Sequence, residues 1–373
     1  MPPNVIDLQK ADDSRDVVHR AVQELAEGRL VAFPTETVYG LAASGLNEAA
    51  VRRLREVKQR GADHPMALAV RSAEEAWDYV PQMSQLACRL ARRCWPGPVT
   101  LVVDDDHPDS LIQQLPAVTR EAVSPSGTIG LRAPAHESIQ EVLKMLAGPL
   151  VLTSANRGGG PESVSAEQVV EALGDDVALV LDDGKCRFGA PSSVVRVQGN
   201  EYEMLRTGVV PPETVRRLAS MMVLLVCTGN TCRSPMAEIL FKQKVAARLK
   251  CQLEEVDQHG MIVMSAGIAA MAGGRPSAEA VNVMNKVGLD LSQHESQPLT
   301  QQLVEHADHI FTMTRSHRDA IVAQWPSAAS RTRLVCSNEQ DVSDPIGGTE
   351  AVYEQCSQQL DKELDNRLNE LEI

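Results

Sequence analysis

Aromatic side chains are scarce in this sequence, where they make up 3% of the 373 residues. Few platforms are therefore available on which the bases of a single-stranded nucleic acid could stack. Positive charge is scarce as well, since 36 Lys and Arg face 50 Asp and Glu, for a net charge of −14. This balance argues against a broad, non-specific grip on DNA, RNA or an anionic membrane, although it allows a local basic pocket. The composition favours small-molecule substrates and argues against DNA as a partner.

Long hydrophobic runs and paired cysteines are also missing. No apolar run approaches the length of about 18 residues that a membrane span needs, and Met1 to Asn4 begin no charged-then-apolar signal. The 8 cysteines are scattered and form no C-x2-C pair, so neither a zinc site nor a disulfide framework is indicated. We therefore expect no membrane span, no metal held by the site residues, and a reducing, cytoplasmic location.

The length predicts two domains, because 373 residues exceed the size at which one hydrophobic core keeps growing. Pro211 and Pro212 break the chain. We expect a first domain over 1–210, a compact linker over 211–220 and a second domain over 221–373. Short apolar runs alternate with helical patterns in the second domain, at 222–226, 262–265, 308–313 and 333–335. This alternation predicts an α/β fold with a doubly wound, four-stranded parallel sheet.

One loop of the second domain carries residues suited to phosphate chemistry, Cys227-Thr228-Gly229-Asn230-Thr231-Cys232-Arg233-Ser234. It follows the apolar run 222–226 and precedes a helical pattern that begins at Pro235, which predicts a strand–loop–helix junction. Backbone N–H groups at such a junction point at a bound anion, and Gly229 lets the chain curl around it.

The side chains of this loop suggest what the bound anion undergoes. The positive field of the junction favours a Cys227 thiolate, which is a nucleophile, and the Ser234 hydroxyl can donate to that thiolate. Arg233 offers a planar, five-donor guanidinium to a phosphoryl group. The alternative is that Cys227 and Cys232 are ordinary buried residues, and the spacing of Arg233 and Ser234 argues against it.

Polar loops at strand ends mark the first half of the chain. Residues 34–40, Pro-Thr-Glu-Thr-Val-Tyr-Gly, follow an expected strand, and an apolar run from Leu150 leads into a polar turn at 154–156. Lys58 and Arg60 stand at the end of a helix that begins after Asn47; they either complement the helix dipole or form a polyphosphate clamp. Residues 104–106, all aspartates, are expected to form a solvated turn, with metal binding as the alternative.

Over about residues 15 to 210, the sequence resembles the threonylcarbamoyl-AMP synthase family. The motifs that carry the resemblance are the heptapeptide 34–40, Lys-x-Arg at 58–60, Trp-Pro-Gly-Pro-Val-Thr at 95–100 and Ser-x-Asn at 154–156. The resemblance implies a twisted mixed sheet with helices. It also implies a reaction in which L-threonine and bicarbonate give a carbamate that attacks the α-phosphate of ATP, normally with Mg²⁺. The product feeds the modification of an adenosine beside the anticodon of tRNA, which leaves room for partner proteins of tRNA modification.

The resemblance also implies roles for single residues. Those matched to ATP binding are Lys58, Arg60, His64, Thr128, Ser154, Asn156 and Arg206. Those matched to threonine binding are Thr35, Tyr39, Arg132 and Ser192, with Arg132 pairing with the threonine carboxylate in fork geometry. No nucleophilic side chain is required, because positioning and charge neutralisation carry the rate.

The chain departs from the family pattern at three places. His64 stands where the family commonly has an asparagine, Ala69 stands where a histidine often closes a strand, and 161–163 read Pro-Glu-Ser in place of a second Ser-Pro. His64 either hydrogen-bonds the nucleotide or is a satisfied loop histidine. These departures leave open a second hypothesis, a domain that only binds nucleotide or RNA.

The second half resembles the low-molecular-weight protein tyrosine phosphatase family across nearly its full length. Besides the loop 227–234, the motifs are Ser-Ala-Gly at 265–267, His-Glu-Ser at 294–296, the segment 312–317 and Asp344-Pro345. The resemblance implies Cys227 as nucleophile, Arg233 and Asp344 as the other catalytic residues, with Asp344 as general acid. The phosphate-binding residues it implies are Gly229, Asn230, Thr231, Cys232 and Ser234.

Two positions bear on the phosphorylated residue that this half acts on. Tyrosine phosphatases of this fold usually carry an aliphatic residue at position 231 and two tyrosines after Asp-Pro, whereas this chain has Thr231 and Ile346-Gly347-Gly348. Both features match the protein-arginine-phosphatase subgroup, so phosphoarginine is the expected substrate, and phosphotyrosine stays open. The alternative for Thr231 is that it only fills space in the loop. Arsenate reduction would need resolving cysteines near the loop, and Cys232 could instead form a protective disulfide with Cys227.

Overall fold

The computed structural model describes residues 3–59 and 65–371. They form two compact units, Met1–Leu218 and Ala219–Ile373, and each is described by itself. The helix α8 (Pro212–Ala219) occupies most of the segment in which we expected a linker. None of the described helices combines the length and the apolar character needed to cross a bilayer.

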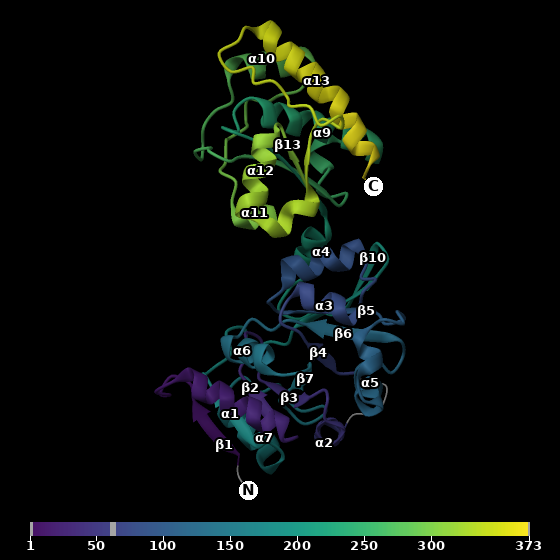
Figure 1. Cartoon of the computed structure of the whole chain (residues 1–373), viewed down its shortest axis with the longest axis vertical. Coiled ribbons are helices and arrows are strands. Elements are labelled where there is room, and N and C mark those ends of the chain that lie inside the picture. Colours follow the sequence, from purple (N-terminus) through teal and green to yellow (C-terminus); the bar gives the residue numbers. More distant parts are fainter. Residues whose placement is uncertain (1–2, 60–64, 372–373) are drawn as a thin grey trace. The chain divides into compact units, whose positions relative to one another are not determined.

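A ten-stranded sheet forms the centre of the first unit (Figure 1). Its strands, in sheet order, are β1 (Asn4–Asp7), β8 (Leu179–Asp182), β2 (Val31–Phe33), β3 (Gly40–Ser44), β7 (Leu150–Ser154), β4 (Ala67–Ala69), β6 (Thr128–Arg132), β5 (Val99–Asp104), β9 (Ser193–Gln198) and β10 (Glu201–Arg206). The sheet contains parallel pairs such as β2 with β8 and β5 with β9, and antiparallel pairs such as β3 with β7 and β5 with β6. The mixed sheet expected for this half is therefore confirmed.

Seven helices and two 3₁₀ turns surround this sheet, among the residues described. They are α1 (Ser14–Ala26), α2 (Glu48–Lys58), α3 (Ala73–Tyr79), α4 (Gln85–Cys94), α5 (Ala117–Val123), α6 (Glu137–Met145), α7 (Ala166–Leu173), η1 (Leu111–Gln114) and η2 (Gly174–Asp176). Helices α1 and α6 bury their apolar stripes against β2, β3, β7 and β8, where they form one hydrophobic core. Helix α2 begins where the sequence predicts, because Asn47 Oδ1 accepts a hydrogen bond from the N–H of Ala50 at 3.0 Å.

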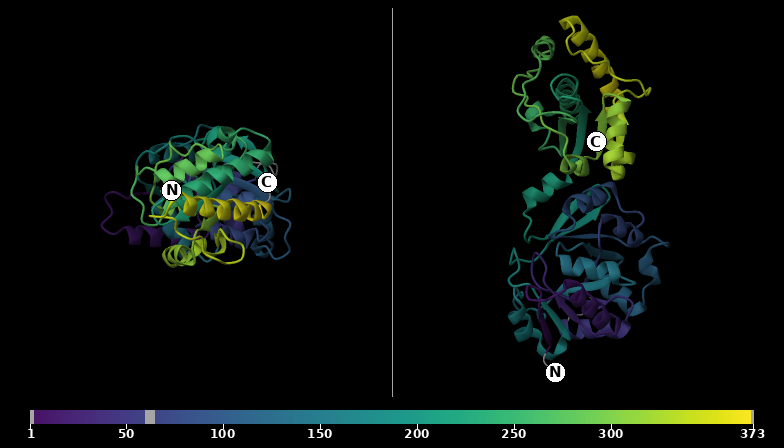
Figure 2. Two further views of the ribbon diagram at one scale, coloured as in Figure 1. Left: turned by 90° about the horizontal axis from the view of Figure 1, so that it is seen from above. Right: turned by 60° about the vertical axis from the view of Figure 1, so that its left-hand side comes forward.

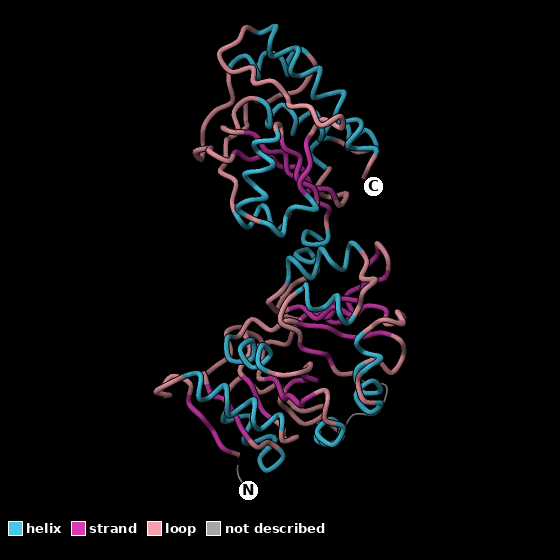
Figure 3. Tube along the Cα trace, viewed as in Figure 1, coloured by secondary structure: helices cyan, strands magenta, loops and turns pink. Residues whose placement is uncertain are grey.

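The second unit has a four-stranded sheet in the order β12 (Met261–Gly267), β11 (Met221–Cys227), β13 (His309–Thr312) and β14 (Thr332–Leu334). Every neighbouring pair in it is parallel, which confirms the doubly wound parallel sheet. All seven residues of the central strand β11 are buried, as its continuous apolar run predicts. The tube in Figure 3 shows these strands inside a shell of helices.

Helices cover both faces of this second sheet. They are α9 (Arg233–Leu249), α10 (Ala278–Lys286), α11 (Gln301–His306), α12 (Arg315–Gln324) and α13 (Glu350–Asn369), with the 3₁₀ turns η3 (Leu253–Glu255) and η4 (Pro326–Arg331). Helices α9, α10 and α13 share one hydrophobic core with the sheet, and α13 lies against α9 on the outside of the unit (Figure 2). Helices α11 and α12 contribute to a second core on the other face. The carboxyl end of β11, where the phosphate loop starts, is thus held from both sides.

Candidate active sites

The phosphate loop joins the end of β11 to the start of α9. Cys227 is the last residue of β11, and α9 begins at Arg233, two residues before the Pro235 start that the sequence suggested. Cys227 is 3% exposed, and its Sγ accepts a hydrogen bond from the N–H of Asn230 at 3.2 Å. The Ser234 hydroxyl lies 2.9 Å from the same sulfur. The strand–loop–helix junction is confirmed, and both neighbours of the sulfur can donate to a thiolate.

Asn230 sets the direction of the hydrogen bonds around the thiol. Its Nδ2 donates to Ser234 Oγ at 2.9 Å and to Ser265 Oγ at 2.8 Å. Ser265 in turn donates its hydroxyl to Glu238 Oε2 at 2.6 Å. Ser234 Oγ accepts from Asn230 through one lone pair, and its hydroxyl hydrogen can be donated to a Cys227 thiolate, which has no hydrogen of its own. The network therefore stabilises negative charge on the sulfur.

The backbone of the loop is held in an uncommon conformation. Asn230 has a φ of 54°, in the left-handed region that non-glycine residues seldom adopt. His294 Nε2 lies 3.0 Å from the Asn230 carbonyl, to which it must donate, and the N–H of Gln297 donates to Asn230 Oδ1 at 2.9 Å. A Cβ on Gly267 would lie 2.5 Å from the carbonyl oxygen of Thr228, so glycine alone lets β12 approach the loop. These contacts give a physical reason for the motifs at 265–267 and 294–296.

Arg233 and Asp344, far apart in the sequence, form an ion pair. Arg233 Nη2 donates to Asp344 Oδ2 at 2.5 Å, and Arg233 Nη1 donates to the Val342 carbonyl at 3.3 Å. The arginine side chain is 6% exposed, whereas the aspartate side chain is 43% exposed. A phosphoryl group that entered the loop would compete with a carboxylate that solvent already reaches.

His317 borders this site, and sequence reasoning gave it no role. Its Nε2 lies 2.9 Å from Thr228 Oγ1, and its Nδ1 lies 2.9 Å from Thr314 Oγ1. The ring is buried, and burial together with the positive charge of Arg233 lowers the pKa of His317 to about 4. The neutral ring therefore connects the loop to the N-cap of α12. The motif at 312–317 contained this histidine, but no local pattern tells which polar group a buried ring will face.

Cys232 and Thr231 lie on the side of the loop near α13. Cys232 Sγ is 3.4 Å from Ser277 Oγ, 3.4 Å from Tyr353 Oη and 3.7 Å from Thr231 Oγ1. Both Cys227 and Cys232 are free thiols. Thr231 is partly buried, between the two cysteines of the loop.

A cavity of about 310 Å³ opens over the sheet of the first unit. Predicted ATP- and threonine-binding residues that line it are Thr35, Tyr39, Thr128, Arg132, Ser154, Ser192 and Arg206. Thr128 and Arg132 share a face of β6 because side chains alternate along a strand. Arg60 and His64 fall outside the described residues. The structure thus brings residues from both ends of the first unit to one cavity.

Arg132 is already paired in this cavity. Its Nη2 donates to Glu36 Oε1 at 2.7 Å and to Thr37 Oγ1 at 2.8 Å, and the two side chains of the ion pair are each 9% exposed. The second carboxylate oxygen of Glu36 accepts from the N–H of Ala135 at 2.9 Å. Glu36 belongs to the heptapeptide 34–40 but received no role from the sequence. The pair fixes the guanidinium in place and offsets its charge.

Lys58 lies behind the cavity, fully buried at the end of α2. Its Nζ donates to Asn156 Oδ1 at 2.6 Å, to the Ser154 carbonyl at 2.7 Å and to the Asn156 carbonyl. Among the described residues that line the cavity, Lys58 does not appear. In this structure its ammonium group therefore organises the turn at 154–156, and its contact with ATP stays a prediction.

Two further predicted residues hold their neighbours. Arg206 donates through Nε and Nη2 to the Ser192 carbonyl at 3.1 and 2.9 Å, and Ser192 Oγ lies 3.0 Å from Thr100 Oγ1. The hydroxyl of Tyr39 donates to the Gly184 carbonyl at 2.8 Å, and burial raises the pKa of Tyr39. Tyr39 therefore lines the cavity, while its hydroxyl group is hydrogen-bonded to the backbone at Gly184.

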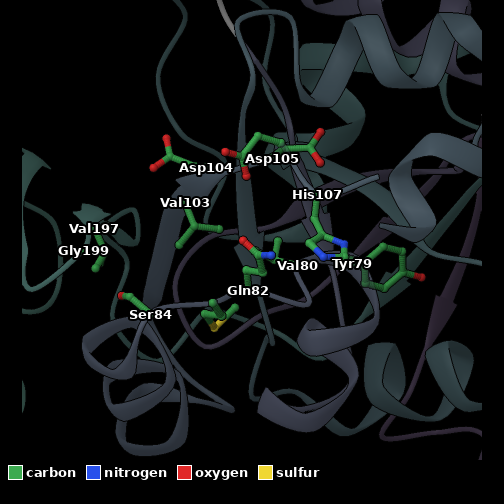
Figure 4. A pocket seen from close by; sticks show the side chains of 12 residues that line it. Tyr79, Val80, Gln82, Ser84, Val103, Asp104, Asp105, His107, Val197 and Gly199 are labelled. Carbon is green, nitrogen blue, oxygen red and sulfur yellow. The ribbon is translucent and has the colours of Figure 1, made fainter. Parts of the chain in front are cut away.

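The aspartates 104–106 border a separate pocket of about 210 Å³ in the first unit (Figure 4). Asp104 Oδ1 pairs with Arg196 Nη2 at 2.5 Å, and Figure 4 shows Asp105 and His107 pointing in different directions. Over the described ranges, no group of three His, Cys, Asp or Glu side chains has an arrangement that could hold a metal ion. The cluster therefore carries no metal assignment.

Comparison with known proteins matches one family to each half of the chain. Residues 23–208 match the model of the Sua5/YciO/YrdC family, described as telomere recombination, and residues 222–372 match the model of low molecular weight phosphotyrosine protein phosphatases.

Three relatives illustrate the two similarities. A threonylcarbamoyl-AMP synthase of Pyrococcus abyssi is 36% identical over 194 residues, which are 52% of this chain and 54% of that protein, so this chain spans about half of its length. A threonylcarbamoyl-AMP synthase of Mus musculus is 30% identical over 223 residues, 58% of this chain and 75% of the relative. A protein-arginine-phosphatase of Geobacillus stearothermophilus is 34% identical over 154 residues, 40% of this chain and 95% of the relative. Both resemblances read from the motifs are confirmed: the chain belongs to the Sua5/YciO/YrdC family in its first half and to the low-molecular-weight phosphatase family in its second.

Proposed function

We propose that the chain is a bifunctional enzyme. Its first unit makes threonylcarbamoyl-AMP from L-threonine, bicarbonate and ATP, and its second unit dephosphorylates proteins, with phosphoarginine as the preferred residue. The phosphatase is carried by the loop in which a thiol with two donors at 2.9 and 3.2 Å lies beside a buried arginine that donates to an aspartate at 2.5 Å. The synthase is supported by the cavity that its predicted substrate-binding residues line. The names of the relatives support the same two activities.

Dephosphorylation would take two steps in the loop. Cys227 Sγ attacks phosphorus and forms an S–P bond while the P–N bond of phosphoarginine breaks, and Asp344 gives its proton to the leaving nitrogen. Water then attacks phosphorus, the S–P bond breaks, Asp344 takes the proton of the water, and inorganic phosphate leaves. Arg233 and the loop N–H groups bind the phosphoryl oxygens, which draws Arg233 away from Asp344 and lets the aspartate take up the proton it donates.

The choice of phosphoarginine rests on the rim of the loop. Thr231 offers a hydroxyl to the polar P–N linkage, and Asp344 can pair with the guanidinium of the substrate as well as deliver a proton. The residues after Pro345 include Ile346, which is 70% exposed, and two glycines, so no aromatic pair follows there to sandwich a phenyl ring. Loss of such a pair removes about 0.5 to 1.5 kcal/mol of stacking for each ring pair.

In the synthase cavity, the chain would act by positioning and by charge. The amine of threonine adds to the carbon of bicarbonate with loss of water, and a carbamate oxygen then forms a bond to the α-phosphorus as pyrophosphate leaves. Arg132 orients the threonine carboxylate, and Arg206 meets phosphate oxygens. Mg²⁺, when bound with ATP, neutralises phosphate charge. The product would serve tRNA modification together with partner proteins that consume it.

One experiment separates synthesis from mere binding in the first unit. The purified chain is incubated with ATP, threonine and bicarbonate, and pyrophosphate release is measured with and without threonine. Threonine-dependent pyrophosphate supports catalysis. ATP binding without any pyrophosphate would instead favour the second hypothesis, a nucleotide-binding module.

A side-by-side assay tests the second unit. Initial rates are measured on peptides that carry phosphoarginine or phosphotyrosine in the same flanking sequence. A higher kcat/KM for phosphoarginine is expected, and a higher value for phosphotyrosine would overturn the choice of substrate while leaving the phosphatase assignment intact.

A further inference from the structure

Glu162 presents a carboxylate oxygen that has no partner. Its Oε2 atom is buried and accepts no hydrogen bond from the part of the chain that the structure describes, although the residue lines the synthase cavity. Leaving a buried charged acceptor unsatisfied costs free energy, and such a group in a native fold calls for an explanation, for which an ion is one candidate. Glu162 also stands at one of the three places where the sequence departs from its family, so family roles do not explain it.

The chain on both sides of Glu162 is fastened. The N–H of Tyr39 donates to the Ser163 carbonyl at 2.8 Å, and Ser163 Oγ donates to the Ala155 carbonyl at 2.6 Å. On the other side, Asn156 Nδ2 donates to the Gly160 carbonyl at 2.6 Å. Glu162 is therefore held at the wall of the cavity by a loop whose two ends are bonded to the body of the unit.

The charges around the cavity indicate what the carboxylate meets. Among the described lining residues, Glu162 is the one carboxylate, and the cations are Arg132 and Arg206. Arg132 is neutralised by Glu36 at 2.7 Å. ATP brings about four negative charges, so a carboxylate beside it is repelled unless a cation lies between them. Mg²⁺ is commonly bound through one or two carboxylates plus substrate phosphates and keeps several waters, which suits a site with one carboxylate.

We infer that Glu162 is a protein ligand of the Mg²⁺ ion that accompanies ATP into the synthase cavity. The inference rests on the proposed function, because it requires the first unit to bind ATP. The same oxygen could instead accept a hydrogen bond from the hydroxyl of threonine. The experiment distinguishes this role from metal binding.

The test compares Glu162→Gln with the wild-type chain and with Glu171→Gln, an exposed carboxylate on α7 that serves as the matched control. ATP affinity is measured by calorimetry in Mg²⁺ and again in EDTA, and Mn²⁺ is titrated into the ATP complex with electron paramagnetic resonance as the readout. Glutamine keeps the size of the side chain and removes the charge. Neither measurement depends on turnover.

The inference predicts a specific pattern. Removal of an outer-shell partner of a metal typically weakens metal binding about 10- to 100-fold, so loss of a direct ligand should weaken Mn²⁺ binding to the ATP complex by at least about tenfold in Glu162→Gln and not in Glu171→Gln. ATP affinity in EDTA should stay the same or rise, because a negative charge has been removed.

Three results would overturn the inference. Unchanged metal affinity in Glu162→Gln rules out the ligand role. Equal weakening of ATP in Mg²⁺ and in EDTA assigns Glu162 to the structure of the loop. Loss of threonine affinity, measured by titrating threonine in the same calorimeter, with metal affinity intact assigns its oxygen to threonine. If the wild-type chain binds no ATP, it is the proposed function of the first unit that fails.

Discussion

The residues of the phosphate loop are close together in the sequence, whereas those of the synthase cavity are spread over the first unit. Residues 227–234 supply the thiol, the backbone donors and the arginine in one consecutive stretch, and Asp344 alone of the proposed catalytic residues comes from far away. The cavity draws on residues from Thr35 to Arg206, carried by strands from both halves of a ten-stranded sheet. The loop thus depends on one strand end and one helix start, whereas the cavity depends on the register of a whole sheet.

The two sites also hold their cations differently. The partner of Arg233 has a side chain that is 43% exposed, so an incoming phosphoryl group can replace it. The partner of Arg132 has a side chain that is 9% exposed, and Lys58 is enclosed by carbonyl and amide oxygens. A phosphoryl group can therefore displace the carboxylate that pairs with Arg233, whereas the contacts of Arg132 and Lys58 in the first unit hold protein groups in place.

The largest expected effect separates the two units completely. Cys227→Ser should lower phosphatase turnover at least about 10⁴-fold, the scale on which removal of a catalytic nucleophile acts. Pyrophosphate release by the first unit should not change, because Cys227 belongs to the second unit. Both activities are measured on one preparation. Retained phosphatase turnover would remove Cys227 from the nucleophile role, and Cys251→Ser is the matched control.

The same difference explains how much the sequence could predict. The loop, its junction and the four strands of the second sheet follow from local patterns, because an apolar run, a glycine and a capping residue act within a few positions. The pairing of Glu36 with Arg132 and the enclosure of Lys58 by Asn156 join residues that local patterns treat separately. The sequence therefore predicts which residues are candidates for a site, but it does not predict the residue that each of them contacts. His317 belongs with these, since burial and facing partners come from the assembled sheet.

Lys58→Met tests the enclosed cation. The substitution keeps a long apolar stem and leaves the oxygens of Ser154 and Asn156 without their donor, which should cost about 3 kcal/mol of first-unit stability. Denaturant unfolding followed by the fluorescence of Trp77 and Trp95, with Trp325 replaced by phenylalanine, reports on the first unit alone. Lys144→Met, at an exposed pair with Glu141, should change stability by less than about 1 kcal/mol. Equal effects of the two substitutions would contradict the structural role of Lys58.

His317→Gln tests the buried ring in the second unit. Its pKa of about 4 lies below the ordinary value of 6.5, so between these pH values the unfolded chain binds a proton that the folded chain does not. Stability should therefore fall as the pH drops from 6.5 through 4, by up to about 3 kcal/mol at roughly 1.4 kcal/mol per pKa unit. Glutamine has no such titration, so the variant should lose less stability over this window. Unfolding of the second unit is measured from pH 7 to 4, with His259→Gln as an exposed control.

Parallel pH curves for the wild-type chain and His317→Gln would show that the ring does not resist protonation in the fold. If stability falls more steeply with pH in the wild-type chain than in His317→Gln, the fold around the loop depends on a neutral ring that lies outside residues 227–234. The second unit would then also rely on a contact between residues far apart in the sequence. The control should follow the wild-type chain, because it removes an exposed side chain and leaves the buried ring of His317 in place.

Thr231→Ile should produce the smallest effect and bears on specificity alone. The hydroxyl at the rim is lost and an aliphatic surface replaces it, so the ratio of kcat/KM for phosphoarginine over phosphotyrosine should fall about tenfold, or roughly 1.4 kcal/mol. Thr231→Ser keeps the hydroxyl and should keep the ratio. An unchanged ratio in the isoleucine variant would show that Thr231 only fills space in the loop. Substrate choice would then depend on Asp344 and the residues after it. Because the hydrogen bonds to Cys227 Sγ come from Asn230 and Ser234, this single position can be changed without removing a donor to the nucleophile.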